Sequence, residues 1–169
     1  MGPTARVVIV SMVGLLIAGC VTEDPRRRNS APAVQAPAGS QPAVLQIFAG
    51  AARDTNGNNY VDTVTITAFL FDEQRYDLPI RVEGSFTFRL TRADGTVLAE
   101  WQFSPEDGDR ALVRMPPGPG YRFDLSLLAK GGDKLEPQAV DLTGVFTPVK
   151  GTPVTSAGGA TLRLGRISL

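Results

Sequence analysis

Apolar and polar residues alternate at every second position through much of this chain, and this alternation limits the fold more than any other feature. It is clearest at 64–70, where Val64, Ile66 and Ala68 alternate with threonines. Successive side chains of a β-strand point to opposite faces, so the pattern predicts strands with one apolar face. Between residues 43 and 169 no stretch has the clear period of an amphipathic helix. The sequence therefore predicts an all-β fold.

Glycine and proline separate the apolar runs at regular intervals. Ala93–Thr96 is a tight-turn signal between two runs, and Pro116–Gly120 is a corner before another. About seven to nine short strands at such spacing are typical of a single antiparallel β-sandwich. The strands that we expect are 44–48, 64–70, 80–82, 86–90, 97–103, 111–115, 121–127, 139–146 and 161–169.

Most aromatic residues fall within these expected strands. We interpret them as core or inter-sheet packing, because aromatic side chains bury large areas. A surface that stacks carbohydrate or peptide is the alternative. The residues concerned are Phe69, Phe86, Phe88, Trp101, Phe103, Tyr121 and Phe123.

Two of these segments resemble a known pattern. Gly84-Ser-Phe86-Thr-Phe88, followed by Pro117-Gly-Pro-Gly120-Tyr121, is similar to the G-x-F-x-F … P-G-x-Y pattern of transthyretin-like and carboxypeptidase-regulatory-like sandwiches. In this chain a long segment separates the two halves of the pattern. The resemblance implies an immunoglobulin-like or transthyretin-like sandwich, and it carries no functional conclusion because a fold hosts many functions.

The N-terminus has the parts of an export signal. Arg6 precedes an apolar run, Val7–Ile17, which is shorter than the ~20 residues that a membrane-spanning helix needs. Small residues and then Cys20 follow. The motif Ile17-Ala18-Gly19-Cys20 resembles the lipobox of bacterial lipoproteins. The alternatives are an ordinary secretory signal and an uncleaved signal anchor.

The lipobox resemblance implies a lipid-anchored protein. It implies that a diacylglyceryl group alkylates Cys20, that the signal peptide 1–19 is removed, and that the new amine is acylated. Cys20 is the only cysteine of the chain, and two or three acyl chains give stable anchoring. The expected location is the cell membrane or outer membrane, with the bilayer as partner. Val21 is not the aspartate linked to inner-membrane retention, which favours the outer membrane.

Residues 20–42 have the composition of a linker. Four prolines punctuate a run of alanine, serine, glutamine and glycine without hydrophobic period, so we expect a disordered spacer that spans about 25 Å as a coil. Arg26–Arg28 within it either contacts anionic lipid headgroups or is a solvated charge run. The expected division is a signal peptide (1–19), a lipidated linker (20–42) and a β-sandwich (43–169).

The segment 54–62 has the spacing of a calcium loop. Oxygen-bearing side chains recur at relative positions 1, 3, 5 and 9, with a backbone carbonyl available at position 7. Calcium takes six to eight oxygen ligands, which such spacing can point inward. The segment resembles an EF-hand-type or thrombospondin-repeat-type calcium loop. The resemblance implies calcium ligands at Asp54, Asn56, Asn58, Tyr60 and Asp62.

Two departures leave another interpretation open. Position 12 is Thr65 rather than glutamate, and position 6 is Asn59 rather than glycine. Residues outside the loop, such as Asp72 or Asp77, would then be needed to complete the ligand shell. The alternative is an Asx-turn loop, in which asparagine and aspartate side chains cap their own backbone. Both interpretations predict a polar connection between the first two strands.

The composition argues against several functional classes. The chain has no histidine and no cysteine besides Cys20, which removes the usual nucleophile–base pairs and zinc sites. The formal net charge is zero, which disfavours nucleic-acid binding. The acidic residues show no paired spacing, and we expect no enzyme. They are Glu83, Glu100, Glu106, Asp107 and Asp109, of which the last three fall in an expected polar loop at 104–109.

The sequence predicts a membrane-anchored envelope lipoprotein that acts as a non-catalytic structural or protein-interaction module, with an envelope protein as partner. An exposed apolar edge strand would favour this function. The alternative is a lipoprotein that binds calcium or a small ligand through the Asp54–Asp62 loop. A concave pocket lined by that loop and by aromatic residues would favour the alternative.

Overall fold

The computed structural model describes residues 36–72 and 76–166. These residues belong to one compact unit, Val34–Leu169. The expected signal peptide, the lipobox with Cys20 and the linker up to residue 35 lie outside the described residues. No helix in the described part of the chain is long and apolar enough to cross a bilayer.

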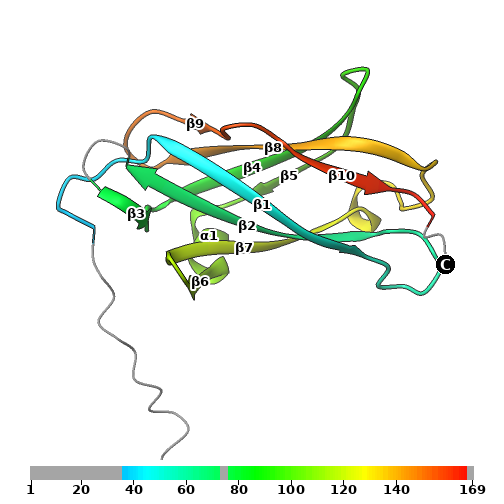
Figure 1. Ribbon diagram of the computed structural model, residues 1–169, viewed down its shortest axis with the longest axis horizontal. Coiled ribbons are helices and arrows are strands. Elements are labelled where there is room, and N and C mark those ends of the chain that lie inside the picture. Colours follow the sequence, from blue (N-terminus) through cyan, green and yellow to red (C-terminus); the bar gives the residue numbers. More distant parts are fainter. Residues whose placement is uncertain (1–35, 73–75, 167–169) are drawn as a thin grey trace, which may run out of the picture. The chain divides into compact units, whose positions relative to one another are not determined.

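Two antiparallel sheets pack face to face (Figure 1), so the predicted β-sandwich is confirmed. The first sheet has the order β1 (Val44–Arg53), β2 (Thr63–Asp72), β7 (Gly118–Ser126), β6 (Leu112–Met115), and β3 (Tyr76–Ile80) pairs with the end of β2. The second has the order β10 (Ala160–Leu164), β8 (Gln138–Pro148), β4 (Gly84–Arg92), β5 (Val97–Phe103), and β9 (Val154–Thr155) pairs with β8.

The core lies between the sheets, where the period-two alternation placed it. Along β2, Val64, Ile66 and Leu70 point inward and are buried. Phe86 on β4 is fully buried and its ring centroid lies 4.8 Å from that of Tyr121 and 4.7 Å from that of Phe146. Each such aromatic pair stabilises the fold by about 0.5–1.5 kcal/mol beyond its buried area.

Phe69 is the exception among the aromatic residues expected in the core. It alternates with Ile66, Ala68 and Leu70 along β2 and is not part of the buried cluster between the sheets. Its ring is nevertheless buried, because it lies against Phe48, Phe71 and the backbone of Gly120 on the outer side of the first sheet. Phe69 is therefore buried, as predicted, but strand parity places it outside the cluster between the sheets.

The segment expected to be a polar loop at 104–109 begins a short helix, α1 (Pro105–Ala111). Ser104 caps it: its hydroxyl accepts a hydrogen bond from the Asp107 N–H, and the Asp107 carboxylate accepts one from the Ser104 N–H. This reciprocal pair is a capping box. The expectation of a loop was wrong because seven residues are too few to show a helical period. Gly108 places α1 against Phe86 of β4.

Other boundaries also differ from expectation. The strand expected at 80–82 is β3 and ends at Ile80, and β9 had no sequence signal. Residues 36–43, expected in the linker, contact the sandwich: the Gln41 N–H donates to the Asp72 carboxylate, and the Ala43 N–H donates to the Phe71 carbonyl. The packed part of the chain therefore begins before β1.

Strand β1 also contacts the second sheet. Leu45 forms a parallel bridge with Ser156, and its carbonyl accepts a hydrogen bond from the Ala157 N–H. The two sheets are therefore joined along one side of the sandwich. On the opposite side, α1 contacts β4, β5 and β7. At the other end of β1 and β2, the Val61 N–H donates to the Gly165 carbonyl and the Leu127 N–H to the Asp62 carbonyl. The loop between the two strands is therefore held in place, and it is the first candidate site.

Candidate functional site

The Asp54–Asp62 loop joins β1 to β2 at one end of the sandwich. Two of its residues have left-handed backbone, Gly57 with φ 75° and Asn59 with φ 66°. Glycine and asparagine adopt this conformation at low cost. Asn59 therefore fills the place where calcium loops carry glycine, as the sequence allowed.

Three side chains of the loop cap its own backbone. Asp54 Oδ1 accepts a hydrogen bond from the Gly57 N–H at 2.7 Å, and Asp54 Oδ2 accepts one from the Asn59 N–H at 2.7 Å. Asn56 Oδ1 accepts from the Asn58 N–H, and Asn58 Oδ1 accepts from the Tyr60 N–H. These contacts are the Asx-turn arrangement, and they bring together the oxygens of positions 1, 3 and 5.

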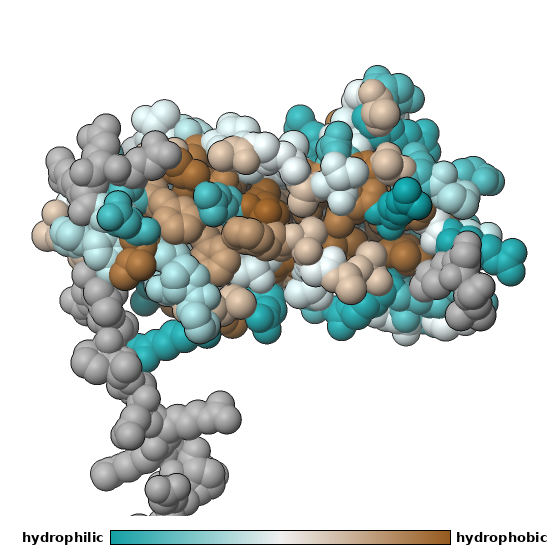
Figure 2. Space-filling model, viewed as in Figure 1, coloured by the Kyte–Doolittle hydropathy of each residue, from teal (hydrophilic) through white to brown (hydrophobic). Residues whose placement is uncertain are grey.

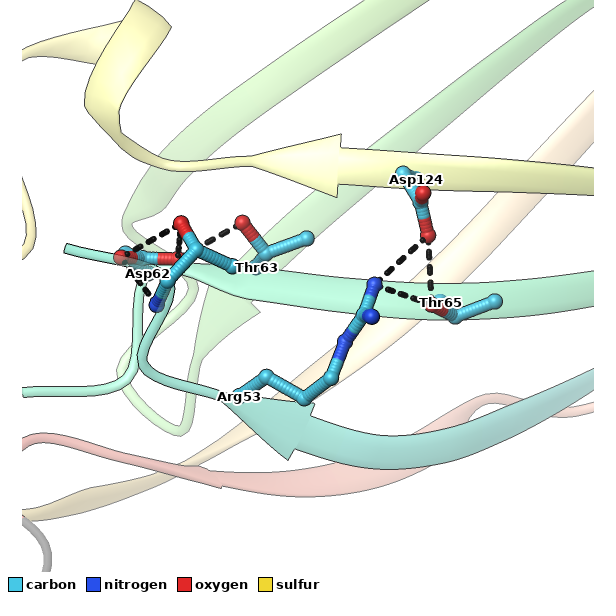
Figure 3. Close-up of polar contacts among 6 residues, drawn as sticks. Arg53, Asp62, Thr63, Thr65 and Asp124 are labelled. Atoms are coloured by element: carbon cyan, nitrogen blue, oxygen red, sulfur yellow. Dashed lines mark hydrogen bonds and ion pairs between the residues drawn. The ribbon is translucent and has the colours of Figure 1, made fainter. Parts of the chain in front are cut away.

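Asp62 is the buried polar centre of the loop. Its carboxylate is fully buried and accepts hydrogen bonds from the backbone N–H groups of Thr55 (2.8 Å) and Asn56 (3.1 Å) and from the Thr55 hydroxyl (2.8 Å). It also accepts one from the Thr63 hydroxyl (2.7 Å) (Figure 3). Burial raises the pKa of this carboxyl, but the hydrogen bonds from Thr63, Thr55 and Asn56 outweigh burial and hold the pKa below its usual range. Asp62 therefore holds the loop closed.

A second buried carboxylate reaches the loop from another part of the chain. Asp133 is 4% exposed, and its Oδ2 accepts hydrogen bonds from Asn56 Nδ2 at 3.0 Å and from Asn58 Nδ2 at 2.8 Å. The hydrogen bond from Asn58 is the main cause that lowers the pKa of Asp133. Sequence reasoning missed this contact, because only the pairing of β7 with β2, which sets Ser126 opposite Thr63, brings the two loops together.

The calcium ligands expected from sequence are thus only partly brought together. Asp54, Asn56 and Asn58 share the loop surface, whereas the Asp62 carboxylate is occupied by four donors. Asp72 was named to complete the shell, but it lies at the far end of β2, about 30 Å away at the rise of a ten-residue strand. Asp77, on β3, lies at that same far end. In the part of the chain that the structure describes, no three acidic, histidine or cysteine residues form a metal-binding group.

A polar cluster lies beside the loop on the outer face of the first sheet. Arg53 donates to Thr65 Oγ1 at 2.9 Å and to Asp124 Oδ1 at 3.2 Å, and Thr65 donates to the same Asp124 oxygen (Figure 3). The three residues come from β1, β2 and β7. Arg53 and Asp124 are exposed, so the cluster is a surface ion pair of small energetic weight.

Three of the five carboxylates weighed for catalysis bind neighbouring groups. Glu100 pairs with Arg89 at 2.7 Å, and Asp109 pairs with Arg81 at 2.9 Å. Asp107 belongs to the helix cap. The arginine hydrogen bond is the main cause that lowers the pKa of Glu100. Each of these three carboxylates therefore has a structural partner in the fold.

The outer face of the first sheet also carries three phenylalanines, which we call the aromatic surface: Phe48, Phe69 and Phe71. The ring centroids of Phe48 and Phe69 lie 5.8 Å apart in an edge-to-face arrangement, and those of Phe69 and Phe71 lie 6.4 Å apart. Phe48 is 56% exposed although it is a large apolar side chain. Figure 2 shows apolar residues gathered over the face on which β1 and β2 lie.

A hollow of about 530 Å³ adjoins the aromatic surface at the start of β1. Val44, Gln46 and Phe71 line it together with Tyr76 and Asp77 of β3. Sequence reasoning did not single out Phe48. The alternation along β1 could have identified Phe48 as outward-facing, because the strand presents Gln46 and Phe48 on one side and buries Leu45 on the other.

The aromatic surface and the Asp54–Asp62 loop are thus two candidate sites within the described residues. Comparison of the chain with protein-family models, with curated proteins and with solved structures finds no match.

Proposed function

We propose that the protein is a lipid-anchored, non-catalytic interaction module of the cell envelope, and that a protein partner binds its aromatic surface. The observation that carries this proposal is the exposure of Phe48 beside Phe69 and Phe71 on an edge strand of the first sheet. When a partner buries a large aromatic side chain that is exposed in the free protein, removal of this apolar area from water stabilises the complex.

The composition of this surface supports a protein as the partner. Aromatic residues, methionine and arginine are enriched where protein partners meet and dominate the binding energy there. Near the three phenylalanines, Arg122 of β7 pairs with Thr67 of β2, and its guanidinium lies 3.9 Å from Met115 Sδ. The surface therefore combines the three residue types that are typical of interface centres.

The adjoining hollow supplies concave shape. Its volume of about 530 Å³ accommodates a large side chain, and anchor residues of a partner commonly insert into such pockets. Gln46, Tyr76 and Asp77 supply hydrogen-bonding groups beside the apolar side chains of Val44 and Phe71. A partner side chain that combines an apolar body with a polar end fits this site best.

The anchoring part of the proposal rests on the lipobox Ile17–Cys20. Because residues 36–43 contact the sandwich, a linker of about 20 Å between Cys20 and the sandwich would hold the aromatic surface near the membrane. Confinement to a surface raises the effective concentration of a membrane-bound partner. Weak binding through a small apolar surface then suffices.

Photo-crosslinking in cells tests the proposal. A photoreactive residue at position 48 should crosslink one protein in the membrane fraction, and the same residue at Val149, which is 60% exposed elsewhere, should not. Phe48→Gln with the photoreactive residue at Gln46 should lose most of the crosslink. Equal crosslinking from positions 48 and 149 contradicts a specific surface, and membrane retention with normal processing of Cys20→Ala contradicts the lipid anchor.

Calcium binding at the Asp54–Asp62 loop is a second candidate function, because Asn56 and Asn58 both point at the buried Asp133 carboxylate. Rotation of each amide by 180° would turn its oxygen toward Asp133, at the cost of the hydrogen bonds that the Asn58 and Tyr60 N–H groups donate to these oxygens. Calcium prefers oxygen ligands, and a cation bound there would have to offset this loss. Millimolar calcium should raise the midpoint of thermal unfolding of the parent chain, and this rise should be lost in Asp133→Asn. If calcium does not change the midpoint of the parent chain, the loop is not a calcium site.

A further inference from the structure

We propose that a cavity where β8 begins and β10 ends, which we call the Arg163–Arg166 cavity, binds a small organic anion that carries an apolar group. The cavity has a volume of about 470 Å³, within the range of small-molecule sites. It is distinct from the aromatic surface, so this inference is independent of the proposed function.

The floor of the cavity is apolar. Val61 and Leu164 line it, and both are buried members of the core cluster. Ala139 pairs with Arg163 across the β8–β10 ladder, and its methyl group leaves open the space that a larger side chain would fill. Ala139 and Arg163 face outward, whereas Val61 and Leu164 present only the edge of the core to the cavity. An apolar group of a ligand can therefore lie on Ala139 against this edge.

The wall of the cavity is held in place by the backbone. Gly165 has φ 104° and lies so close to the Pro137 backbone that an added Cβ would stand 2.6 Å from Pro137 Cα. The Gly165 carbonyl accepts a hydrogen bond from the Val61 N–H at 3.2 Å, and Arg166 forms a bridge with Tyr60. The cavity is thus formed before any ligand binds, which lowers the entropic cost of binding.

Arg163 and Arg166 both belong to the lining of the cavity. The ion pairs among the described residues use Arg53, Arg81, Arg89 and Arg110. Within residues 36–72 and 76–166, no carboxylate forms an ion pair with Arg163 or Arg166. Both are exposed members of the cavity lining. Their charge is therefore available to an external anion.

The chemistry of the ligand follows from the combination of an apolar floor with two arginines. A guanidinium offers parallel N–H donors that match the oxygens of a phosphate or carboxylate. A bare inorganic ion would use the two arginines and leave the apolar floor in contact with water. An alkyl or ring group attached to the anion would cover Ala139 and the edge of the core at Val61 and Leu164. The structure assigns the cavity to such amphiphilic anions, whether free or borne by a lipid.

Isothermal titration of the full chain carrying Cys20→Ala tests the proposal with three probes: hexyl phosphate, inorganic phosphate and hexanol. Each methylene removed from water strengthens binding about fourfold, so hexyl phosphate should bind at least tenfold tighter than inorganic phosphate. Hexanol should bind at least tenfold more weakly than hexyl phosphate, because it cannot use the arginines. Equal affinities within either pair overturn the proposal.

Variants locate the binding. The double variant Arg163→Gln, Arg166→Gln should lose at least tenfold in affinity for hexyl phosphate, and Ala139→Leu should lose a similar factor by filling the space. Arg110→Gln is the matched control, because it removes an exposed arginine of α1 that is not part of the cavity lining, and it should retain the affinity. Unchanged binding by the double variant overturns the proposal. Far-ultraviolet circular dichroism must match between all variants.

Vesicles distinguish the two sources of the anion. Anionic phospholipid vesicles that displace hexyl phosphate from the parent chain, and bind the double variant more weakly than the parent chain, assign the cavity to a lipid headgroup. Hexyl phosphate that stays bound in the presence of such vesicles assigns it to a free organic anion.

Discussion

Replacement of Asp62 by alanine should destabilise the sandwich more than any other change in the Asp54–Asp62 loop. The carboxylate accepts hydrogen bonds from two backbone N–H groups, Thr55 and Asn56, and from two hydroxyls. The hydroxyls can rotate toward other acceptors, but the two N–H groups cannot. A hydrogen bond to a charged group contributes about 1.5–3 kcal/mol, so Asp62→Ala should lower the free energy of unfolding by about 3–6 kcal/mol.

Asp62→Asn separates the hydrogen bonds from the charge. The amide oxygen can still accept from both N–H groups, so the cost should fall to about 1–2 kcal/mol. The matched control is Asp124→Asn, which alters an exposed carboxylate and should cost less than about 1 kcal/mol. Urea unfolding at pH 7, followed by the fluorescence of the single tryptophan, Trp101, measures all three values.

The pH dependence gives a second measurement of Asp62. Its pKa is lower in the folded chain than the value of about 4 in an unfolded chain. Stability from this group is therefore present above pH 4 and is lost as the pH falls through the folded pKa. Asp62→Asn should lose less stability than the parent chain between pH 5 and pH 2. A cost of Asp62→Ala below 1 kcal/mol, or equal costs for alanine and asparagine, would refute the reasoning.

Three further predictions concern the sandwich itself. Burial raises the pKa of Tyr121 to about 12, so the parent chain should lose stability as the pH rises from 10 to 12, and Tyr121→Phe should not. At pH 7, Tyr121→Phe should lower the free energy of unfolding in urea by about 1–3 kcal/mol, because the Val82 backbone loses its hydrogen-bond partner. Gly84→Ala should lower the thermal midpoint by several degrees, since its Cβ would collide with the Thr147 carbonyl. Ser104→Ala should cost about 0.5–2 kcal/mol by loss of the helix cap, and a cost near zero would show that α1 is held by packing alone.

The sequence could predict the sandwich because its strands are long enough to show alternation. β5 matches the expected strand 97–103 at both ends, and the expected hairpin turn is present, where the Arg92 N–H donates to the Thr96 carbonyl. β9 has two residues and α1 has seven, which is too short for a period of two or 3.6 to be recognised. Their presence depends on tertiary packing, which no local pattern records.

In the candidate sites, too, the features that depend on neighbouring residues could be predicted, and those that depend on distant residues could not. The polar turn between β1 and β2 could be predicted, because asparagine and aspartate cap their own backbone within a few residues. The partner of Asn56 and Asn58 could not, since Asp133 lies more than 70 residues further along the chain. The outward face of Phe69 follows from the parity of β2, but its burial by Phe48 and Gly120 required the strand order.

The position of Phe48 so close to the start of β1 has a mechanical consequence. Val44 of β1 pairs with Phe71 of β2, and Phe48 pairs with Thr67. A pull between the N-terminal side of the chain and a partner held at the aromatic surface would act along these strands. It would load the adjacent β1–β2 hydrogen bonds in shear, so that several must break at once. The rest of the sandwich would carry little of that force.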